Sequence, residues 1–154
     1  MQKLLPTLLA LLFLMPQMAR ASELNSLSTQ GQYADVVEYV ENAIINKGLT
    51  IDYSGEVSRM LERTGADVGS TKAIYTGAKF FLFCSATLSR EMMEADPRTM
   101  GLCPFSVYVY EAREEPGVVH VGYRRPGQGA NEAANKVLVK IDKLLESIIT
   151  EATE

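Results

Sequence analysis

The chain has few of the residue types that most often carry metal or acid–base chemistry. Its 154 residues include one histidine, two cysteines and no tryptophan, and the formal charge is −4. The acidic balance argues against a nucleic-acid-binding protein, which would need a basic surface to neutralise phosphates. One histidine and two cysteines leave little for a metal site built only from those residue types. We therefore expect no nucleic-acid partner and no cofactor.

Familiar catalytic motifs are also missing. Without CxxC or CxxCH, neither thioredoxin-type chemistry nor covalent c-type haem attachment is indicated. There is no serine elbow, no HExxH and no paired-carboxylate signature, so a hydrolase has no support. The single histidine, His120, lies in a strand pattern, where a surface role or a hydrogen-bonded role is more usual than catalysis. The sequence favours a non-enzyme over an enzyme.

Residues 1–21 have the pattern of a cleavable signal peptide. Lys3 precedes an apolar run from Leu4 to Met15, and Ala19-Arg20-Ala21 fits the small-x-small cleavage pattern. The run is about a dozen residues, shorter than the roughly 20 that span a bilayer. An uncleaved anchor is the alternative. We expect cleavage before Ser22, export to the periplasm or secretion, and no stable membrane insertion afterwards.

The mature chain, residues 22–154, is predicted to be a single α+β domain. Loss of Lys3 and Arg20 would take the formal charge from −4 to −6. A chain of this size can bury one hydrophobic core without metal or disulfide staples. Export would also place both cysteines in an oxidising compartment.

Hydrophobic spacing predicts the order of the elements, although residues 22–31 and 66–78 give no clear pattern. We expect helices over 33–46 and 56–63, a short helix before Pro97 with Ser89 as its N-cap, and a last helix over 131–149. Strands are expected over 49–53 and 79–84, with a hairpin of 105–111 and 118–123. This order predicts a mainly antiparallel sheet with two long helices on one face. Lys136, Lys140 and Lys143 of the last helix should face water.

The two cysteines stand at comparable places, Cys84 at the end of one strand and Cys103 at the start of the next. If these strands pair in antiparallel fashion, the two sulfurs could come within bonding distance. Three interpretations stay open: a structural disulfide, two buried thiols, or a functional pair that is redox-active or binds a ligand. Three intervening methionines would add soft ligands for Cu(I) or haem; they are Met92, Met93 and Met100.

The segment Tyr123-Arg124-Arg125 offers a second candidate. Two adjacent arginines at a strand end, with Tyr108 and Tyr110 nearby, could hold an anionic or planar ligand. The alternative is ordinary solvated charges, paired with Glu114 or Glu115.

Four segments in order resemble the domain of unknown function 302 family: Ile45 to Leu49, Phe80 to Cys84, Met93 to Pro97, and Leu102 to Phe105. The chain has Phe83-Cys84-Ser85-Ala86 where the family typically has Phe-Gly-Asn-Pro. It has Leu102-Cys103-Pro104 in place of Asp-Leu-Pro, and Tyr123-Arg124-Arg125-Pro126 in place of Tyr-Asn-Asp-Pro.

The resemblance implies a β-α-β(4)-α-like fold, often dimeric, with a first strand before Tyr33 and no settled activity. It also implies that the recurring turns line one cleft, which would bring the two cysteines together. The expected cleft residues are Cys84, Ser85, Met92, Met93, Cys103, Pro104, Tyr123, Arg124 and Arg125. The sequence thus predicts an exported accessory protein that binds a small ligand or a protein partner. The alternatives are a thiol-redox or sulfur-handling protein using the two cysteines, or a haem or Cu(I) binder.

Overall fold

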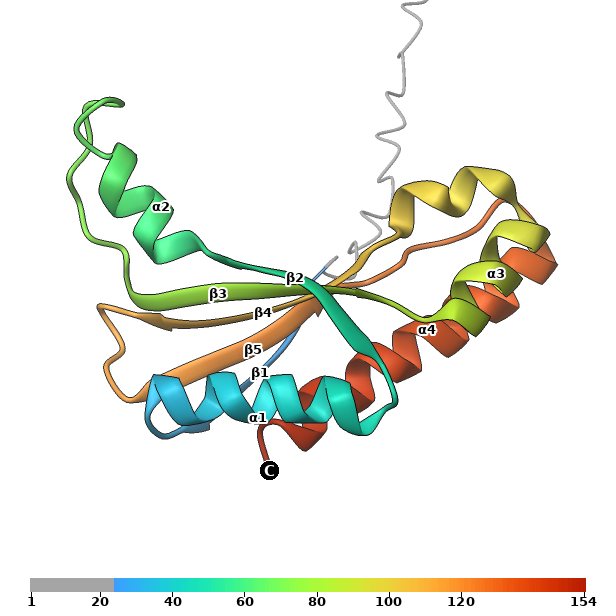
Figure 1. Cartoon of the computed structure of the whole chain (residues 1–154), viewed down its shortest axis with the longest axis horizontal. Coiled ribbons are helices and arrows are strands. Elements are labelled where there is room, and N and C mark those ends of the chain that lie inside the picture. The colour runs from blue at the N-terminus through green and yellow to red at the C-terminus, as the bar shows by residue number, and fades with distance from the viewer. Residues whose placement is uncertain (1–23) are drawn as a thin grey trace, which may run out of the picture.

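The computed structural model of the chain describes residues 24–154 (Figure 1). The predicted signal peptide, residues 1–21, lies outside the described residues. In chain order the elements are β1 (Leu24–Gln30), α1 (Tyr33–Asn46), β2 (Thr50–Glu56), α2 (Val57–Thr64), β3 (Tyr75–Cys84), α3 (Ala86–Ala95), the 3-10 helix η1 (Pro97–Leu102), β4 (Phe105–Ala112), β5 (Val118–Arg124) and α4 (Glu132–Glu151).

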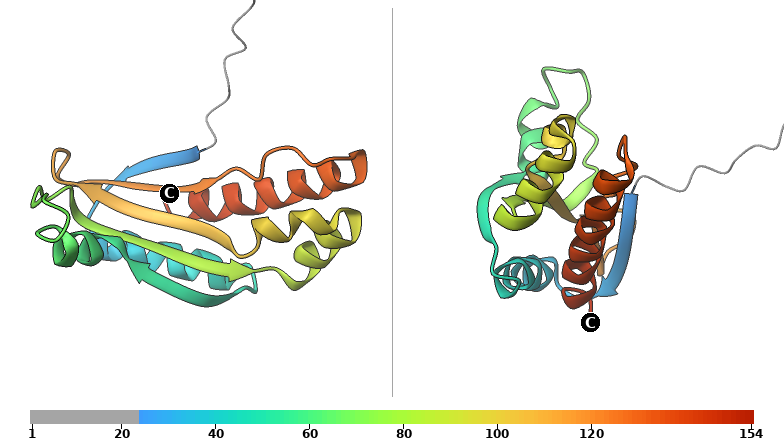
Figure 2. Two further views of the ribbon diagram at one scale, coloured as in Figure 1. Left: turned by 90° about the horizontal axis from the view of Figure 1, so that it is seen from above. Right: turned by 90° about the vertical axis from the view of Figure 1, so that its right-hand side faces the viewer.

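The strands form one antiparallel sheet in the order β1-β5-β4-β3-β2. The two long helices, α1 and α4, cover one face of it, as the sequence predicts (Figures 1 and 2). Alternate strand residues such as Phe81, Val107 and Val121 meet Val40 of α1 and Ile141 of α4 in the core. Burial of this single apolar face is the main stabilising term of the fold.

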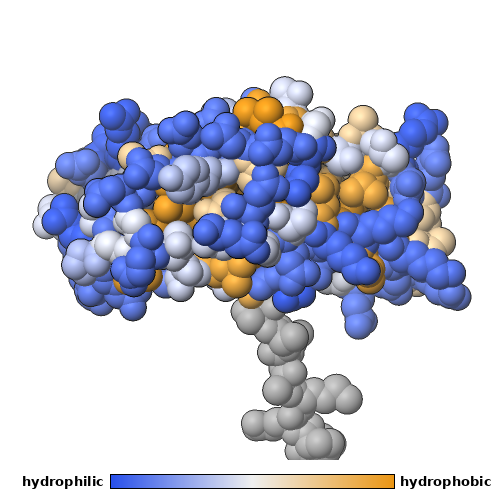
Figure 3. Space-filling view, turned by 90° about the horizontal axis from the view of Figure 1, so that it is seen from below, coloured by the Kyte–Doolittle hydropathy of each residue, from blue (hydrophilic) through white to orange (hydrophobic). Residues whose placement is uncertain are grey.

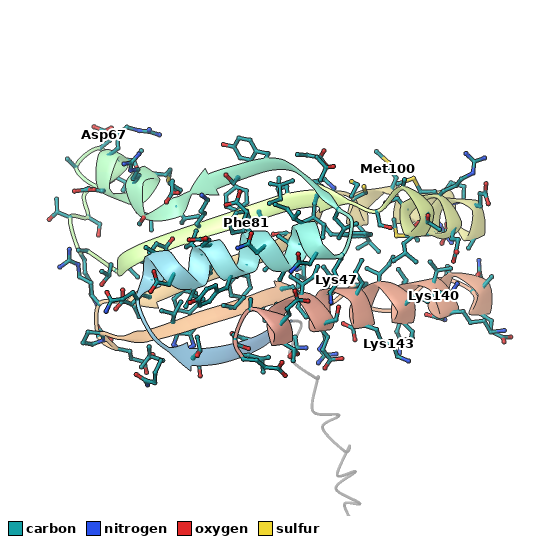
Figure 4. All side chains as sticks on the ribbon, turned by 60° about the horizontal axis from the view of Figure 1, so that its bottom comes forward. Lys47, Asp67, Phe81, Met100, Lys140 and Lys143 are labelled. Atoms are coloured by element: carbon teal, nitrogen blue, oxygen red, sulfur yellow. The ribbon has the colours of Figure 1, made fainter. Side chains whose placement is uncertain are left out.

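The molecule is elongated because helical segments extend beyond both ends of the sheet. At one end lie α2 and the loop that follows it; at the other, α3 and η1 lie beside the first half of α4 (Figure 2). Figure 4 shows Asp67 and Met100 at these opposite ends, with Phe81 between them on the helix-covered face of the sheet. Each end has its own candidate site.

The helix-covered side is mostly hydrophilic, with only separate apolar patches between the polar side chains (Figure 3). The three lysines predicted to face water on α4 are exposed: Lys136, Lys140 and Lys143. Lys140 also forms an ion pair of 2.7 Å with Glu91 of α3. Among residues 24–154, no helix combines the length and apolar character needed to cross a bilayer.

The first strand, β1, has no alternating pattern in the sequence. It is an edge strand whose two half-buried residues, Asn25 and Thr29, are polar. Asn25 uses its amide to donate a hydrogen bond of 3.0 Å to the Tyr123 hydroxyl. Because this strand holds its place by backbone pairing and polar contacts, hydrophobic spacing could not find it. β1 is the strand before Tyr33 that the family resemblance implies.

Two local predictions need correction. The N-cap of α3 is Ser85, whose hydroxyl accepts a hydrogen bond from the Leu88 N–H, and not Ser89. The helix therefore begins directly after β3, and Ser89 lies within its second turn. In addition, β3 begins at Tyr75 rather than Lys79, and β2 continues through Gly55 to Glu56. The glycine is tolerated in the strand because the Phe80 ring lies over it.

Candidate functional site

Cys84 and Cys103 are brought together at the end of β3 and the start of β4. Phe83 pairs with Phe105, which puts Cys84 opposite Pro104 at the end of the ladder, with Cys103 one residue further along the chain. Both cysteines are half-buried free thiols, and a hydrogen bond joins their side chains. The Cys103 Sγ also lies 3.7 Å from the Ser89 Oγ of α3.

The surroundings of Cys84 keep its thiol protonated. Burial, followed by the hydrogen bond that the Cys84 S–H donates to Cys103, raises the pKa of Cys84 to about 11. The thiolate is the nucleophilic form of cysteine, so Cys84 is a slow nucleophile near neutral pH.

The remaining residues around α3 have structural roles. Met92 is fully buried in the core, and Met93 packs against the same core. Ser85 is occupied as the helix cap. Met100 is 60% exposed on η1. Within residues 24–154, no three His, Cys, Asp or Glu side chains gather into a group that could hold a metal ion.

Tyr123 is fully buried, and its hydroxyl belongs to the core rather than to a ligand site. The Oη donates a hydrogen bond of 2.8 Å to Asp142 Oδ1 of α4. Burial raises the pKa of Tyr123 to about 12, and the Asp142 contact adds to the effect. The same carboxylate binds Arg125 through its other oxygen at 3.0 Å. The partner of Arg125 is therefore Asp142, and not Glu114 or Glu115.

A small cleft of about 240 Å³ follows the predicted turns in part. It includes Pro104, Arg124 and Arg125, together with Leu102 and Ser106. Neither cysteine and neither of the two α3 methionines lines it. The structure thus separates the predicted cleft into two places, a thiol pair and an arginine-lined hollow.

The face of the sheet opposite α1 and α4 is lined with aromatic rings, which sequence reasoning did not assemble. We call it the aromatic face and define it by Tyr53, Tyr75, Phe80, Tyr108, Tyr110 and His120. His120 stacks on Tyr110 with ring centroids 4.8 Å apart, and Tyr110 stacks on Tyr108 at 6.1 Å. Tyr75 meets Tyr110 edge-on at 5.5 Å, while Tyr53 and Phe80 are 5.9 Å apart.

Glycines let these rings lie low on the sheet. A Cβ on Gly122 would stand 2.6 Å from Tyr108 Cζ, and one on Gly55 would stand 2.6 Å from Phe80 Cε1. Both rings therefore occupy space that any other residue would fill. Between Leu24 of β1 and Val57 of α2 this face has a hollow of about 380 Å³, floored by Phe80, Tyr108 and other strand residues. The volume is within the usual range for small-molecule sites.

Sequence reasoning saw only fragments of this face. Tyr108 and Tyr110 are visible as the alternate face of a strand, and an antiparallel sheet usually presents a polar outer face to water. The sequence did contain one signal for the aromatic face, which is the excess of aromatic residues at the positions of β3 and β4 that point away from the core. What the sequence could not supply was the strand register that stacks His120 on Tyr110.

Comparison with known proteins assigns the chain to a family. The sequence matches the family described as "Domain of unknown function DUF302" over residues 25–150. The chain belongs to the DUF302 family. No curated protein sequence is detectably similar to it.

A solved structure has the same fold. It is the uncharacterized conserved DUF302 protein from Bacillus stearothermophilus, with a TM-score of 0.71 and 15% sequence identity. The alignment covers 86% of this DUF302 chain and 99% of the other. At this level of identity the likeness supports the architecture, and the sites described above are argued from the chain's own residues.

Proposed function

We propose that this DUF302 chain is an exported, non-catalytic accessory protein that binds a small planar apolar ligand on the aromatic face. The observation that carries the proposal is the hollow of about 380 Å³ lined by Tyr75, Phe80, Tyr108 and Tyr110. Aromatic rings in a concave site bury a flat ligand by stacking and by removing apolar surface from water.

The character of the face supports a ligand of this kind. The described rings are half-buried or exposed, because the two long helices α1 and α4 lie on the other face of the sheet. An exposed aromatic surface of this extent on a soluble chain usually marks a binding site. The walls provided by Leu24 and Val57 make the site concave, which suits a small molecule better than a flat protein surface.

The test uses a naphthalene sulfonate dye as the probe, with fluorescence titration of the purified protein. We expect saturable binding that falls about five- to thirtyfold in Tyr108→Ala or Phe80→Ala, since each substitution removes about 1–2 kcal/mol of stacking and burial at about 1.4 kcal/mol per tenfold. Tyr39→Ala on α1, an exposed tyrosine on the other side, is the matched control and should bind normally. Circular dichroism establishes that each variant is folded.

A second copy of the chain is the competing occupant of this face. Analytical ultracentrifugation distinguishes the two. A dimer that dissociates in Tyr108→Ala, together with no saturable dye binding by the wild type, would replace the small ligand with a homodimer interface.

Export is part of the proposal and rests on the pattern of residues 1–21. Expression of the whole chain in a Gram-negative host should give a periplasmic product whose N-terminal residue is Ser22. An intact chain in the membrane fraction would favour the uncleaved anchor instead.

A second candidate function is favoured by the hydrogen-bonded thiols of Cys84 and Cys103. In a thiol-redox protein, these thiols would form an S–S bond and give up two protons and two electrons. The acceptor would be a disulfide of a protein partner, which is reduced to two thiols.

Thiol titration of the protein purified from the periplasm tests this second candidate. A bond that a mild reductant opens in the native state would support redox function, and a bond that opens only after denaturation indicates a structural staple. A visible spectrum and metal analysis of the same sample test the haem and Cu(I) alternative. If the sample is colourless, contains no copper and binds neither haem nor Cu(I) when they are added, the haem and Cu(I) alternative is excluded.

A further inference from the structure

A further cavity lies at the α2 end of the molecule, at the opposite end from the thiols, and it meets the aromatic hollow at Tyr75. It has a volume of about 500 Å³ and lies between α2, the loop that joins α2 to β3, and the start of α1. Figures 1 and 2 show this end as an open angle between α2 and the sheet. Its lining mixes apolar side chains such as Leu61 and Ile74 with hydroxyl and charged side chains from all three segments.

Tyr33, the first residue of α1, lines this cavity with a hydroxyl that has no partner. The Oη is buried, and no hydrogen-bond acceptor for it exists among residues 24–154. A buried hydroxyl left unpaired costs free energy, so an orphan of this kind calls for an explanation. The ring reaches this place because Gly77 lies under it, where a Cβ would stand 2.6 Å from Tyr33 Cζ.

The charged groups around the cavity leave an excess of donors. Lys72 pairs with Glu114 and Lys79 pairs with Glu56, each at 3.5 Å. Arg59 and Arg113 line the cavity, and neither guanidinium has a hydrogen bond or ion pair with residues 24–154. Two acidic side chains also line the cavity: Glu56, which is paired with Lys79, and Glu62. The guanidinium groups of Arg59 and Arg113 and the Tyr33 hydroxyl remain without a side-chain partner among residues 24–154.

We infer that this cavity binds a small organic anion whose carboxylate or phosphate oxygens accept from Tyr33, Arg59 and Arg113. Arginine offers a planar fork of donors that matches an oxyanion. The tyrosine hydroxyl stays a donor, and a ligand oxygen there would supply the acceptor that the chain lacks. The volume leaves room for a molecule larger than a bare inorganic ion. Apart from Tyr75 at its edge, this cavity shares no residue with the aromatic hollow of the proposed function. The two proposals are therefore tested independently.

The experiment is isothermal titration of the mature protein with succinate, citrate and inorganic phosphate, with sodium chloride as the ionic-strength control. We expect one of the three anions to bind with a dissociation constant below about 10 mM. Tyr33→Phe should weaken that binding about tenfold or more, since a hydrogen bond to a charged acceptor contributes roughly 1.5–3 kcal/mol. Arg59→Gln and Arg113→Gln should each weaken it, and Arg90→Gln on α3 should not.

Thermal unfolding separates a binding role from a structural one. Without anion, Tyr33→Phe should be at least as stable as the wild type, because it removes an unpaired buried hydroxyl. Addition of the anion should raise the stability of the wild type more than that of Tyr33→Phe. Tyr39→Phe, further along α1, should behave as the wild type in both conditions. Tighter binding of citrate or succinate assigns a carboxylate ligand, and tighter binding of phosphate assigns a phosphorylated one.

The inference is overturned if none of the three anions binds below about 10 mM, or if Arg59→Gln and Arg113→Gln bind as the wild type does. Tyr33→Phe that loses stability without anion while keeping its affinity would also overturn it. Dye binding to the aromatic face is measured on the same samples, so failure of either site leaves a separate result for the other.

Discussion

Tyr123 of β5 donates a hydrogen bond of 2.8 Å to Asp142 of α4, and this contact joins the strand next to the sheet edge to the last helix. Arg125 holds the other carboxylate oxygen at 3.0 Å, and Asn25 of the edge strand donates to the Tyr123 hydroxyl. One phenol therefore links three elements through a fully satisfied polar contact in the core. Tyr123, which the sequence suggests as part of a ligand-binding segment, braces the fold at this position.

Removal of that hydroxyl should destabilise the protein. Tyr123→Phe leaves the Asp142 carboxylate with Arg125 alone and takes the acceptor from Asn25, so we expect a loss of about 1–3 kcal/mol in the free energy of unfolding. Urea denaturation followed by circular dichroism measures it. Glu146→Gln, an exposed change on the same helix, is the control and should stay within about 0.5 kcal/mol of the wild type. Equal stability of the two variants would contradict the role of the hydroxyl.

Gly122 should be intolerant of even one added methyl group. Its Cβ would stand 2.6 Å from both the Asn25 carbonyl oxygen and Tyr108 Cζ, so the edge strand and the ring cannot both stay in place. We expect Gly122→Ala to lower the free energy of unfolding by about 1–3 kcal/mol. Dye binding on the aromatic face should fall as well, because Tyr108 must move.

The control for this substitution is Gly101→Ala on η1, where an added Cβ meets nothing within 4 Å. It should keep both stability and dye affinity. If Gly122→Ala matched Gly101→Ala, the close approach of Tyr108 to the sheet would not be a constraint.

The thiol of Cys84 should react slowly until the solution is strongly alkaline. With a pKa of about 11, its thiolate fraction and its rate of alkylation by iodoacetamide should rise about tenfold per pH unit from pH 7 to 10. Peptide mass spectrometry of quenched samples measures the rate at this residue. Cys103→Ala removes the hydrogen bond that helps to raise the pKa, so the profile should move to lower pH. Ser89→Ala removes a side-chain hydrogen bond to Cys103 rather than to Cys84, so it should leave the Cys84 profile nearly unchanged.

Hydrophobic spacing predicted the parts of the fold that depend on it. The stripe of Val36, Val40 and Ile44 indicated α1, and the alternation that begins at Phe105 indicated β4, because each buries one face against the core. The edge strand β1 was not recognised, because its half-buried residues are polar and its pairing is made by the backbone. The N-cap of α3 was predicted wrongly for a related reason. Ser85 and Ser89 have the same side chain, and only the residue at which β3 ends decides which of them caps the helix.

The candidate sites divide in the same way. Antiparallel pairing was enough to predict that Cys84 and Cys103 lie at the same end of the sheet, since the end of one strand meets the start of the next. The aromatic face and the Tyr33 cavity depend on register and on where α2 leaves the sheet. Both are set by contacts between residues far apart in the chain, which periodicity in a single sequence does not encode.

Stability in acid should depend on Asp96, which links α3 to η1. Its carboxylate accepts from the Arg98 side chain at 3.0 Å and from the Arg98 N–H at 3.1 Å, and these bonds lower the pKa of Asp96. A carboxyl whose pKa is lower in the folded state stabilises the protein above its unfolded pKa of about 3.9. This contribution is lost as the pH falls through the lower folded value.

We therefore expect Asp96→Asn to reduce stability at pH 7 and to make the free energy of unfolding less dependent on pH below about 4. Urea denaturation at a series of pH values from 2 to 7 measures both effects. Glu94→Gln is the matched control, since Glu94 pairs with Arg90 on the exposed side of α3, and it should keep the slope of the wild type. If Asp96→Asn retained that slope too, the acid sensitivity would arise elsewhere, because the variant cannot release a proton at this position.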